Sequence, residues 1–380
     1  MENNKNFKTK IFRKIRQIPR QDWDAVFPDV LESYDFLASI DDSPFPQFSF
    51  SYIMVYDGDT PVGAAPSFTM YFAFDMTVQG MLKKALVIFK RIFPSALDHK
   101  VLMCGMPMAQ GRIGIAGDHE GAIKAIIAGL EEVAHREKAS LLILKDFSKD
   151  YAPLFEPFLR QGFAKIESLP STDMEINFKS FDEYLDTLSP ISRSGLRRKF
   201  KKANAGIKVD LEIVDSMTDS DISEAHGLYL QTLNKHEGIT VEELPEEFFK
   251  NVAKNMPDRV KFFLWRINGK MAAFAFCLVS PELFIDYYLG FDYALAYQHQ
   301  LYFVRFRDMM QWCIGRGIKK YEMGVTGYEA KRRLGFDFIR LYFYIKHLNP
   351  FINPIVKLLK PFLEPTRFDP VFKEINKTSA

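Results

Sequence analysis

The fold class is decided by residues 283–325, which contain the runs LFIDYYLGF (283–291), LYFVRFRDMMQWCIGRG (301–317) and KKYEMGV (319–325). Their apolar patterns predict a strand, a helix and a second strand, with the loop DYALAYQHQ (292–300) leading into the helix. The helix is expected to begin just after His299 and Gln300, so its N-terminal amides face the mouth between the two strands. An anionic phosphate or a developing oxyanion could be bound and polarised there without a metal ion.

The segments on either side extend this pattern. Two strands joined by Asn268-Gly269, a strong hairpin signal, precede it. The glycine-bearing loop TGYEAKRRLGF (326–336) and a final strand, RLYFYIKH (340–347), follow it. The N-terminal half has the same order of elements, with a helix over Asp22–Ala38 and a hairpin turning at residues 57–59. A chain of 380 residues with 47% hydrophobic content also favours two domains.

We therefore expect an α/β protein with two lobes, each a mixed twisted sheet flanked by helices. The first lobe is placed at residues 1–178, the second, with the active site, at 179–348, and a tail at 349–380. A basic amphipathic insertion near 77–96 either packs on the first lobe or lies on a membrane surface. The tail segment FINPIVKLLKPFLEP is expected to be a strap on the core and is too short to span a bilayer.

Three runs carry a resemblance to a known family: ISRSGLRRKFKKANAG, YYLGFDYALAYQ and IGRGIKKYEMGVTGYEAKRRLGF. They resemble the GCN5-related N-acetyltransferase (GNAT) superfamily, in particular its two-domain branch of FemABX-like and BioF2-like (CelD-like) transferases. The resemblance implies tandem GNAT-like lobes, the first of them degenerate. It also implies an N-acyltransferase that moves an acyl group from acetyl-CoA or another acyl-CoA, without a metal, to a small-molecule or peptide amine.

The donor stays open at this point. Superfamily members that bind acetyl-CoA carry a glycine-containing loop between the strand and the helix, but this chain has no glycine there after Gly290. FemABX-like relatives use aminoacyl-tRNA instead, which would make the protein an aminoacyltransferase acting on a cell-wall or peptide amine. The third alternative is a degenerate, non-catalytic pair of lobes that acts as a binding or membrane-peripheral protein.

Candidate catalytic residues are those able to polarise a carbonyl or move a proton. Lys331 matches a loop lysine of the resembled family and could neutralise a phosphate or an oxyanion; the alternative is a solvated lysine. Glu322, in the middle of a strand, could orient an amine or take its proton; the alternative is a salt bridge to Lys319, Lys320 or a neighbouring arginine. His299, beside the helix start, could act as a base or bind an anion, although a lone histidine is more often a surface or capping residue.

Candidate substrate-binding residues are basic or aromatic side chains near the expected site. Seven basic residues lie between Arg193 and Lys208 with no acid among them, and this run could bind the phosphates of a donor or an acceptor. The named candidates are Arg197, Arg198, Lys201, Lys202, His236, Asp286, Tyr288, Tyr297 and Tyr328.

Composition narrows the remaining classes of function. The net charge of +2 gives no whole-protein field for nucleic acid, so any electrostatic role must be local. The three cysteines are far apart, in apolar runs, and predict neither a disulfide framework nor a zinc site. No long apolar run or secretory signal is present, so a cytoplasmic protein with peripheral membrane contact at most is expected.

Overall fold

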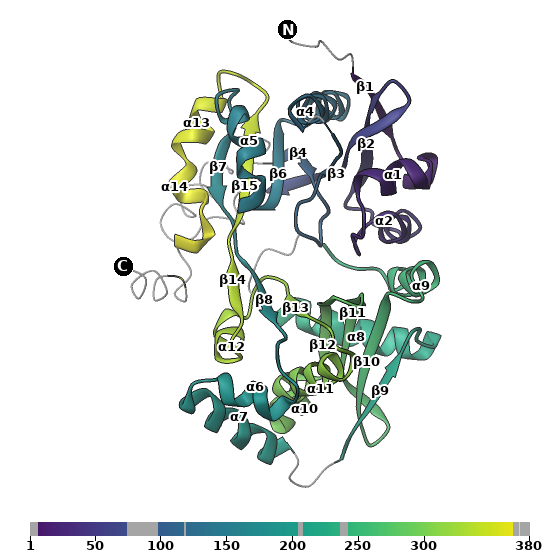
Figure 1. The fold of residues 1–380 in the computed structure, drawn as a ribbon, viewed down its shortest axis with the longest axis vertical. Helices are drawn as coiled ribbons and strands as arrows, with labels where there is room; N and C mark the ends of the chain where they lie inside the picture. The colour runs from purple at the N-terminus through teal and green to yellow at the C-terminus, as the bar shows by residue number, and fades with distance from the viewer. Residues whose placement is uncertain are drawn as a thin grey trace. The chain divides into compact units, whose positions relative to one another are not determined.

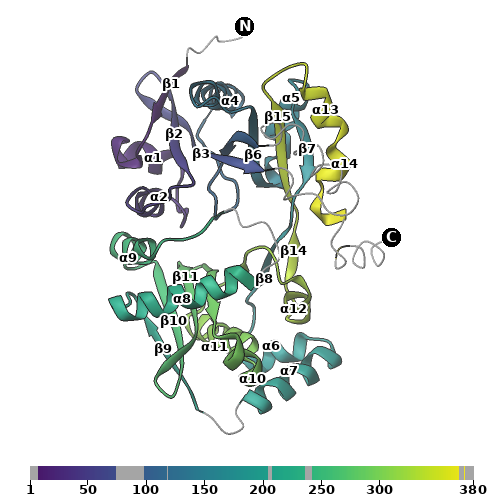
Figure 2. The same cartoon turned by 180° about the vertical axis from the view of Figure 1, so that it is seen from behind.

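The computed structural model describes residues 7–73, 98–117, 119–203, 208–235, 242–367 and 372. The described chain forms two compact units, each built on one mixed β-sheet (Figures 1 and 2). The first unit comprises the described residues up to Leu169, a short segment at 242–243 and the residues from Arg340 onward. The second comprises the described residues of 170–240 and 244–339. The expected α/β class, with helices on mixed sheets, is confirmed.

The first sheet has the strand order β1-β2-β3-β4-β6-β15-β7, with the short β5 paired to β3. β4 and β6 are parallel, and the other neighbours are antiparallel. The elements of this unit are β1 Phe7–Phe12, η1 Ile15–Gln17, α1 Arg20–Val26, α2 Tyr34–Asp41, β2 Ser49–Asp57, β3 Thr60–Ala73, β4 Asp98–Cys104, β5 Gly114–Ile115, α4 His119–Arg136, β6 Leu141–Ser148, η4 Lys149–Tyr151, α5 Ala152–Leu159, β7 Ala164–Glu167, β15 Leu341–His347, α13 Asn353–Leu358, α14 Lys360–Leu363 and η5 Pro365–Arg367.

The second sheet has the order β14-β8-β13-β12-β11-β10-β9, in which β12 and β13 are the parallel pair. Its unit contains β8 Ser171–Glu175, α6 Phe181–Thr187, α7 Pro190–Ala203, β9 Val209–Val214, α8 Asp219–Lys235, α9 Glu246–Asn255, β10 Val260–Ile267, β11 Lys270–Val279, β12 Leu283–Phe291, α10 Tyr293–His299, α11 Leu301–Arg316, β13 Lys320–Met323, α12 Tyr328–Arg333 and β14 Asp337–Ile339.

Helices cover both faces of the second sheet. Phe248 and Phe249 of α9 pack edge-to-face on Phe276 of β11, on the face that α8 also covers. On the opposite face, Phe306 of α11 and Tyr184 of α6 belong to one buried cluster. Alternating aromatic residues along the strands therefore fill two separate core layers, which explains most of the abundant phenylalanine.

Two strands lie in a different sheet from the one that the expected lobe boundaries imply. Residues 340–347 were expected to end the second lobe, but β15 pairs with β6 and β7 of the first sheet. Residues 171–175 were expected in the first lobe, but β8 pairs with β13 and β14 of the second. The two units thus exchange their last strands. The local patterns of β8 (STDME) and β15 (LYFYIKH) predict a strand at most and do not identify the strands with which they pair.

Three segments differ from their expected secondary structure. The expected helix over Asp22–Ala38 is divided into α1 and α2, because Pro28 disfavours helical conformation at Phe27. The expected loop 292–300 contains α10, which Asp292 caps by accepting a hydrogen bond from Leu295 N–H (3.3 Å). The expected loop 326–336 contains α12. The hairpin at 57–59 is confirmed.

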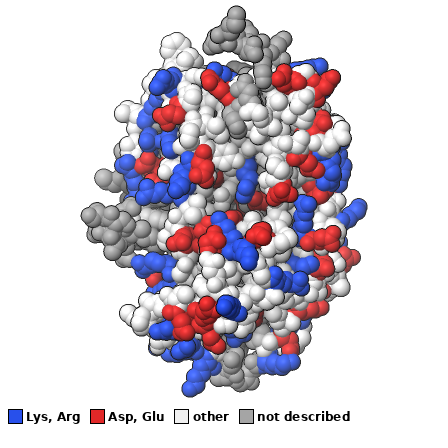
Figure 3. Space-filling model, viewed as in Figure 1, with Lys and Arg blue, Asp and Glu red and all other residues white. Residues whose placement is uncertain are grey.

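Charges are mixed on the face drawn in Figure 3, where basic and acidic side chains are interspersed. Within the described ranges, no helix is long and apolar enough to cross a bilayer. The expected insertion at 77–96 lies outside the described residues.

Candidate active site

The second sheet opens between its two parallel strands. β12 and β13 pair over four residues of each, and the last pair is Asp286 opposite Met323. Beyond this pair β13 ends, whereas β12 continues to Phe291 along β11. The two strands therefore part at Asp286, at the carboxyl end of a parallel pair, which is where open α/β sheets bind ligands.

A β-bulge marks the point of separation. Between β11 and β12 the register shifts after Phe276, which leaves Tyr287 as an extra residue. A bulge bends its strand and reverses the alternation of side chains. Asp286 consequently lies on the face of α11, whereas Tyr288 lies on the face of α8 and contacts the ring of Tyr229 (5.7 Å between centroids). The two residues, both expected at one site, are thus on opposite faces of the sheet.

One backbone donor is directed into the opening. Asp292 N–H donates to Ala272 O of β11 (3.0 Å). Because N–H direction alternates along a strand, the N–H groups of Phe291 and Leu289 are expected to point away from β11. Phe291 N–H, one of these, donates to Thr232 Oγ1 of α8 (3.2 Å). By this alternation Leu289 N–H is also expected to point away from β11, toward the side where β13 has ended. It is suitably placed to polarise a carbonyl oxygen in the opening.

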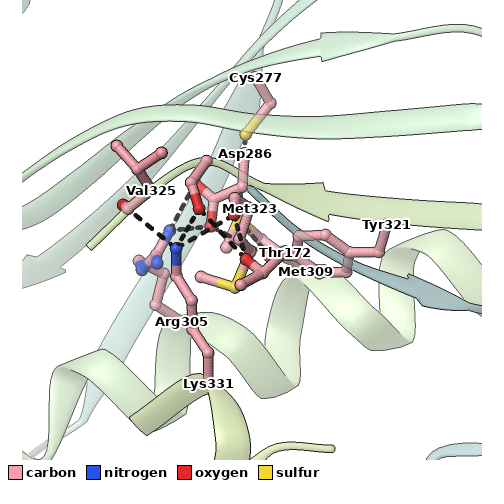
Figure 4. A network of polar contacts seen from close by, with 10 residues as sticks. Thr172, Cys277, Asp286, Arg305, Met309, Tyr321, Met323, Val325 and Lys331 are labelled. Carbon is pink, nitrogen blue, oxygen red and sulfur yellow. Dashed lines mark hydrogen bonds and ion pairs between the residues drawn. The ribbon is translucent and has the colours of Figure 1, made fainter. Parts of the chain in front are cut away.

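A buried ion pair lies beneath the opening (Figure 4). Arg305 of α11 donates through Nη1 to both carboxylate oxygens of Asp286, at 2.7 and 2.6 Å. Tyr321 donates its hydroxyl to the same carboxylate (3.2 Å). Burial opposes the charge of Arg305, but the adjacent Asp286 raises its pKa, and burial next to Asp286 raises the pKa of Tyr321. Arg305 Nε and Nη2 have no hydrogen-bond partner among the described residues.

Lys331 binds the backbone carbonyl groups at the end of β13. Its Nζ donates to the carbonyl oxygens of Met323 (3.1 Å), Gly324 (2.6 Å) and Val325 (3.3 Å), and Figure 4 shows it beside Arg305. The hydroxyl of Thr172 in β8 donates to Met323 O as well. The lysine is therefore neither solvated nor exposed: only 5% of it is accessible. It holds the strand end that forms one side of the opening.

The environment of Lys331 brings the pKa of its amino group close to neutral pH. Burial lowers the pKa of Lys331 to about 7, Arg305 acts in the same direction, and Asp286 opposes them. Three carbonyl acceptors match the three N–H groups of the protonated form. A lysine in such a position can hold a positive charge close to a reacting carbonyl and exchange a proton near pH 7.

Glu322 lies on the opposite face of β13 from this network, because Tyr321 and Met323 on either side of it are the buried residues. Its carboxylate is 3.5 Å from Lys320 Nζ, which is also paired with Asp173 of β8 (2.6 Å). The structure thus contains the salt bridge that the sequence offered as the alternative to a catalytic carboxylate.

The other expected residues are scattered around the opening. His299 ends α10 and is buried, with no hydrogen-bond partner for Nε2 among the described residues. Tyr297 is exposed, and Lys235 Nζ lies 4.5 Å from its ring centre. Tyr328 is buried and donates to Pro170 O (2.9 Å). His236 lies outside the described residues.

The basic run forms α7, which packs beside the start of α11. Its apolar side, with Leu196 and Phe200, is buried, while four basic side chains point outward: Arg197, Arg198, Lys201 and Lys202. Lys199 donates to Gln300 Oε1 (3.3 Å), the residue that precedes α11. The pKa of Lys199 is lowered by partial burial and by the nearby charges of Arg333 of α12, Arg198 and Lys202. Positive charge from α7 and α12 is thus concentrated at the N-terminus of α11.

In the first sheet, the chain that follows β4 fills the place beside β6 where an opening like that between β12 and β13 would lie. β4 and β6 are parallel up to Cys104 opposite Leu144, after which β4 ends. The chain then returns to the edge of β6: Gly111 N–H donates to Asp146 O (3.0 Å), and Lys145 Nζ donates to Ala109 O (3.2 Å). A Cβ on Gly111 would overlap Lys145 O and the Phe147 ring. Gly111 therefore allows the loop after β4 to pack closely against β6.

Sequence reasoning missed Arg305, Tyr321 and Thr172. Arg305 carried a usable signal, because it lies with Leu301 and Met309 at four-residue spacing on the apolar side of the helix. A charge on a buried face needs a buried partner. In the described part of the chain, no group of three or more metal-ligand side chains occurs.

Comparison of the sequence with models of protein families shows the family to which the chain belongs. The model of the FemAB-like family, described as peptidoglycan biosynthesis/recognition, matches residues 14–359. No curated protein matches the sequence.

Solved structures agree on the fold. FemX is 13% identical, with a TM-score of 0.55 over 92% of this chain and 100% of that one. A tandem GNAT protein from the clavulanic acid biosynthesis pathway is 11% identical (TM-score 0.54, 91% and 99%). The C-terminal domain of a putative lysylphosphatidylglycerol synthetase from Agrobacterium fabrum is 11% identical (0.51, 89% and 94%). The expected two-domain GNAT fold of the FemABX-like branch, a transferase fold, is confirmed.

Proposed function

Since the chain belongs to the FemAB-like family, we propose that it transfers an aminoacyl group from a charged tRNA to an amine of a peptidoglycan-type peptide. The amine nitrogen attacks the ester carbonyl of the aminoacyl-tRNA. An amide bond forms, the ester C–O bond breaks, and the proton lost by the amine is taken up by the 3′-terminal oxygen of the tRNA. The reaction needs no oxidant and no further substrate.

The observation that carries the choice of donor is the outward face of α7. Arg197, Arg198, Lys201 and Lys202 have no carboxylate partner among the described residues, and they lie on a helix that packs against α10 and α11. Unpaired basic side chains on one helix face suit a polyanion with many phosphates. They would hold a tRNA while its 3′ end enters the opening between β12 and β13.

α10 supports the same choice. A CoA pyrophosphate needs backbone N–H groups from a glycine-rich loop in front of the helix that follows the strand. In this chain α10 fills residues 293–299, and its hydrogen-bonded backbone and carbonyl end lie next to the start of α11. Acyl-CoA, expected from the GNAT resemblance, remains the donor to test against tRNA.

The residues around the opening would have different roles in the transfer reaction. Leu289 N–H would donate to the carbonyl oxygen as it becomes an oxyanion. Lys331 and Arg305 would add positive charge beneath it, and Asp286 would hold the guanidinium in place. Lys331 would also fix the end of β13 and with it the width of the opening.

The test measures donor binding and transfer separately. Fluorescence anisotropy with bulk aminoacylated tRNA is expected to give saturable binding that weakens steeply between 50 and 200 mM salt. Radiolabelled aminoacyl groups are then expected to pass to a stem peptide with a free side-chain amine, and not to the same peptide with that amine acetylated. Saturable calorimetric binding of acetyl-CoA with no tRNA binding would contradict the proposed donor and favour an acyl-CoA-dependent enzyme.

A further inference from the structure

The segment after β15 exposes an unusual number of large apolar side chains. Phe351 is 89% exposed and Leu358 77%, and Ile352, Ile355 and Leu359 are exposed as well. Their spacing of three, four and seven residues places them on one side of α13 and its flanking turns. We call these five residues the C-terminal apolar patch. Single exposed apolar residues are common, but five on one helical face mark an interaction surface.

The orientation of α13 is fixed by its polar side. Asn353 accepts a hydrogen bond from His347 N–H through Oδ1 (2.9 Å) and donates through Nδ2 to Gly162 O (2.8 Å). These bonds tie the helix to β15 and to the loop before β7, within the first unit. The polar residue thus faces the protein and the apolar residues face outward, the reverse of a helix that straps a core.

The charged residues within the sequence of the patch have one sign. Lys357 and Lys360 are interleaved with the apolar residues, and the sequence from Asn349 to Leu363 contains no acid. The first acid, Glu364, is buried and lies within ion-pair distance of Arg367 and of Lys360 Nζ (3.9 Å), whereas Lys357 has no carboxylate partner among the described residues. Apolar side chains beside lysines form the pattern of a helix that lies in the headgroup region of an anionic bilayer.

We propose that the C-terminal apolar patch docks the protein on an anionic lipid surface, with α13 lying in the plane of the interface. α13 and α14 together are far too short to span a bilayer, so the contact is peripheral. A second copy fits the patch less well, because a two-fold contact would bring the lysines of both copies, Lys357 and Lys360, into one interface without a carboxylate from the patch sequence to pair with them. The patch belongs to the first unit and the opening between β12 and β13 to the second, and the proposal does not depend on the reaction performed there.

Vesicle co-sedimentation tests the proposal on the full chain. Wild-type protein is expected to sediment with vesicles of phosphatidylcholine and phosphatidylglycerol and to bind at least tenfold less well to phosphatidylcholine alone. The variant Ile355→Glu/Leu358→Glu is expected to lose at least tenfold in partitioning. Ile191→Glu changes an equally exposed apolar residue on α7, 87% exposed, and is expected to bind as wild type. Equal melting temperatures for all three would show that the fold is intact.

A second variant gives a direct signal of insertion. Tryptophan emission of Leu358→Trp is expected to shift to shorter wavelength on addition of the anionic vesicles, with a much smaller change in Ile191→Trp. Wild-type protein that stays in the supernatant would overturn the proposal. So would an Ile355→Glu/Leu358→Glu variant that binds as wild type, or a dimer seen by light scattering that this double variant abolishes, since the patch would then be a protein interface.

Discussion

Arg305 Nη1 lies 2.7 and 2.6 Å from the two carboxylate oxygens of Asp286, and both side chains are almost fully removed from solvent. The pair joins α11 to β12 at the residue where β12 separates from β13. Removing one partner of such a pair leaves an uncompensated buried charge, whereas removing both does not. This asymmetry makes the pair testable without knowledge of the substrate.

Arg305→Met should lower the free energy of unfolding by about 3–5 kcal/mol, because Asp286 would remain buried without its cation. The double variant Arg305→Met/Asp286→Leu should recover a large part of that loss. Urea denaturation of Arg305→Met, Asp286→Leu and the double variant measures the coupling. Arg307→Met, in which a half-buried arginine paired with its neighbour Asp308 is removed, should cost no more than about 1 kcal/mol. A double variant as unstable as the sum of the single ones would contradict the interpretation.

Lys331 should make stability depend on alkaline pH. Its folded-state pKa of about 7 is below the unfolded value of 10.5, so the unfolded chain binds more protons between these two values. The free energy of unfolding should therefore rise with pH across this range, by at most about 1.4 kcal/mol per unit, and Lys331→Met should lack this contribution. Denaturation at pH 7.5 and 9.5 gives the difference. The variant Lys149→Met, at an exposed lysine, should keep the wild-type pH dependence. If the free energy of unfolding changes with pH by the same amount in Lys331→Met and wild type, Lys331 does not contribute to the pH dependence.

Lys331→Met should also slow transfer. Loss of a positive charge beneath the reacting carbonyl is expected to lower kcat by about 100-fold, because such groups act mainly on the transition state. The KM for the donor should change little, since the lysine is buried and is not on the face of α7. Single-turnover measurements with bulk aminoacylated tRNA separate the two quantities. A raised KM with normal kcat would instead assign Lys331 to donor binding.

Neutralising α7 should weaken donor binding in a salt-dependent way. Arg197→Ala/Arg198→Ala/Lys201→Ala/Lys202→Ala removes the four outward charges while keeping the buried Leu196 and Phe200. Each phosphate that the protein no longer neutralises should reduce the slope of log K against log salt by about 0.7 to 0.9. Anisotropy titrations at four salt concentrations give this slope. Lys138→Ala/Lys149→Ala, at two exposed lysines of the first unit, is the control and should leave the slope unchanged.

Gly111 and Gly195 should respond in opposite directions to alanine. A methyl group on Gly111 would overlap Lys145 O and Phe147, so Gly111→Ala should destabilise the protein by about 1–3 kcal/mol. Gly195 lies within α7 with no neighbour close to its Cβ position, so Gly195→Ala should stabilise by up to about 1 kcal/mol. Thermal unfolding distinguishes the two. Equal melting temperatures for both variants would mean that the loop after β4 can move away from β6.

Local pattern was enough to predict most elements of both sheets, because apolar alternation and the Asn268-Gly269 turn are properties of neighbouring residues. It was not enough to assign β8 and β15 to their sheets, since strand pairing is decided by residues distant in sequence. The same distinction separates the site residues. The basic run was recognisable as a run, whereas the contact of Lys331 with Met323, Gly324 and Val325 depends on how α12 folds back on the strand end. Tyr288 was grouped with Asp286 because a bulge cannot be read from alternation alone.

The exchange of strands between the two sheets limits the order in which the nascent chain can fold. β7 has β15 as its paired neighbour in the first sheet, and β15 also pairs with β6. During synthesis from the N-terminus, residues 341–347 emerge after the whole second sheet has been made. β7 must therefore wait with unpaired backbone groups until translation is almost complete, so the first half of the polypeptide cannot mature ahead of the second.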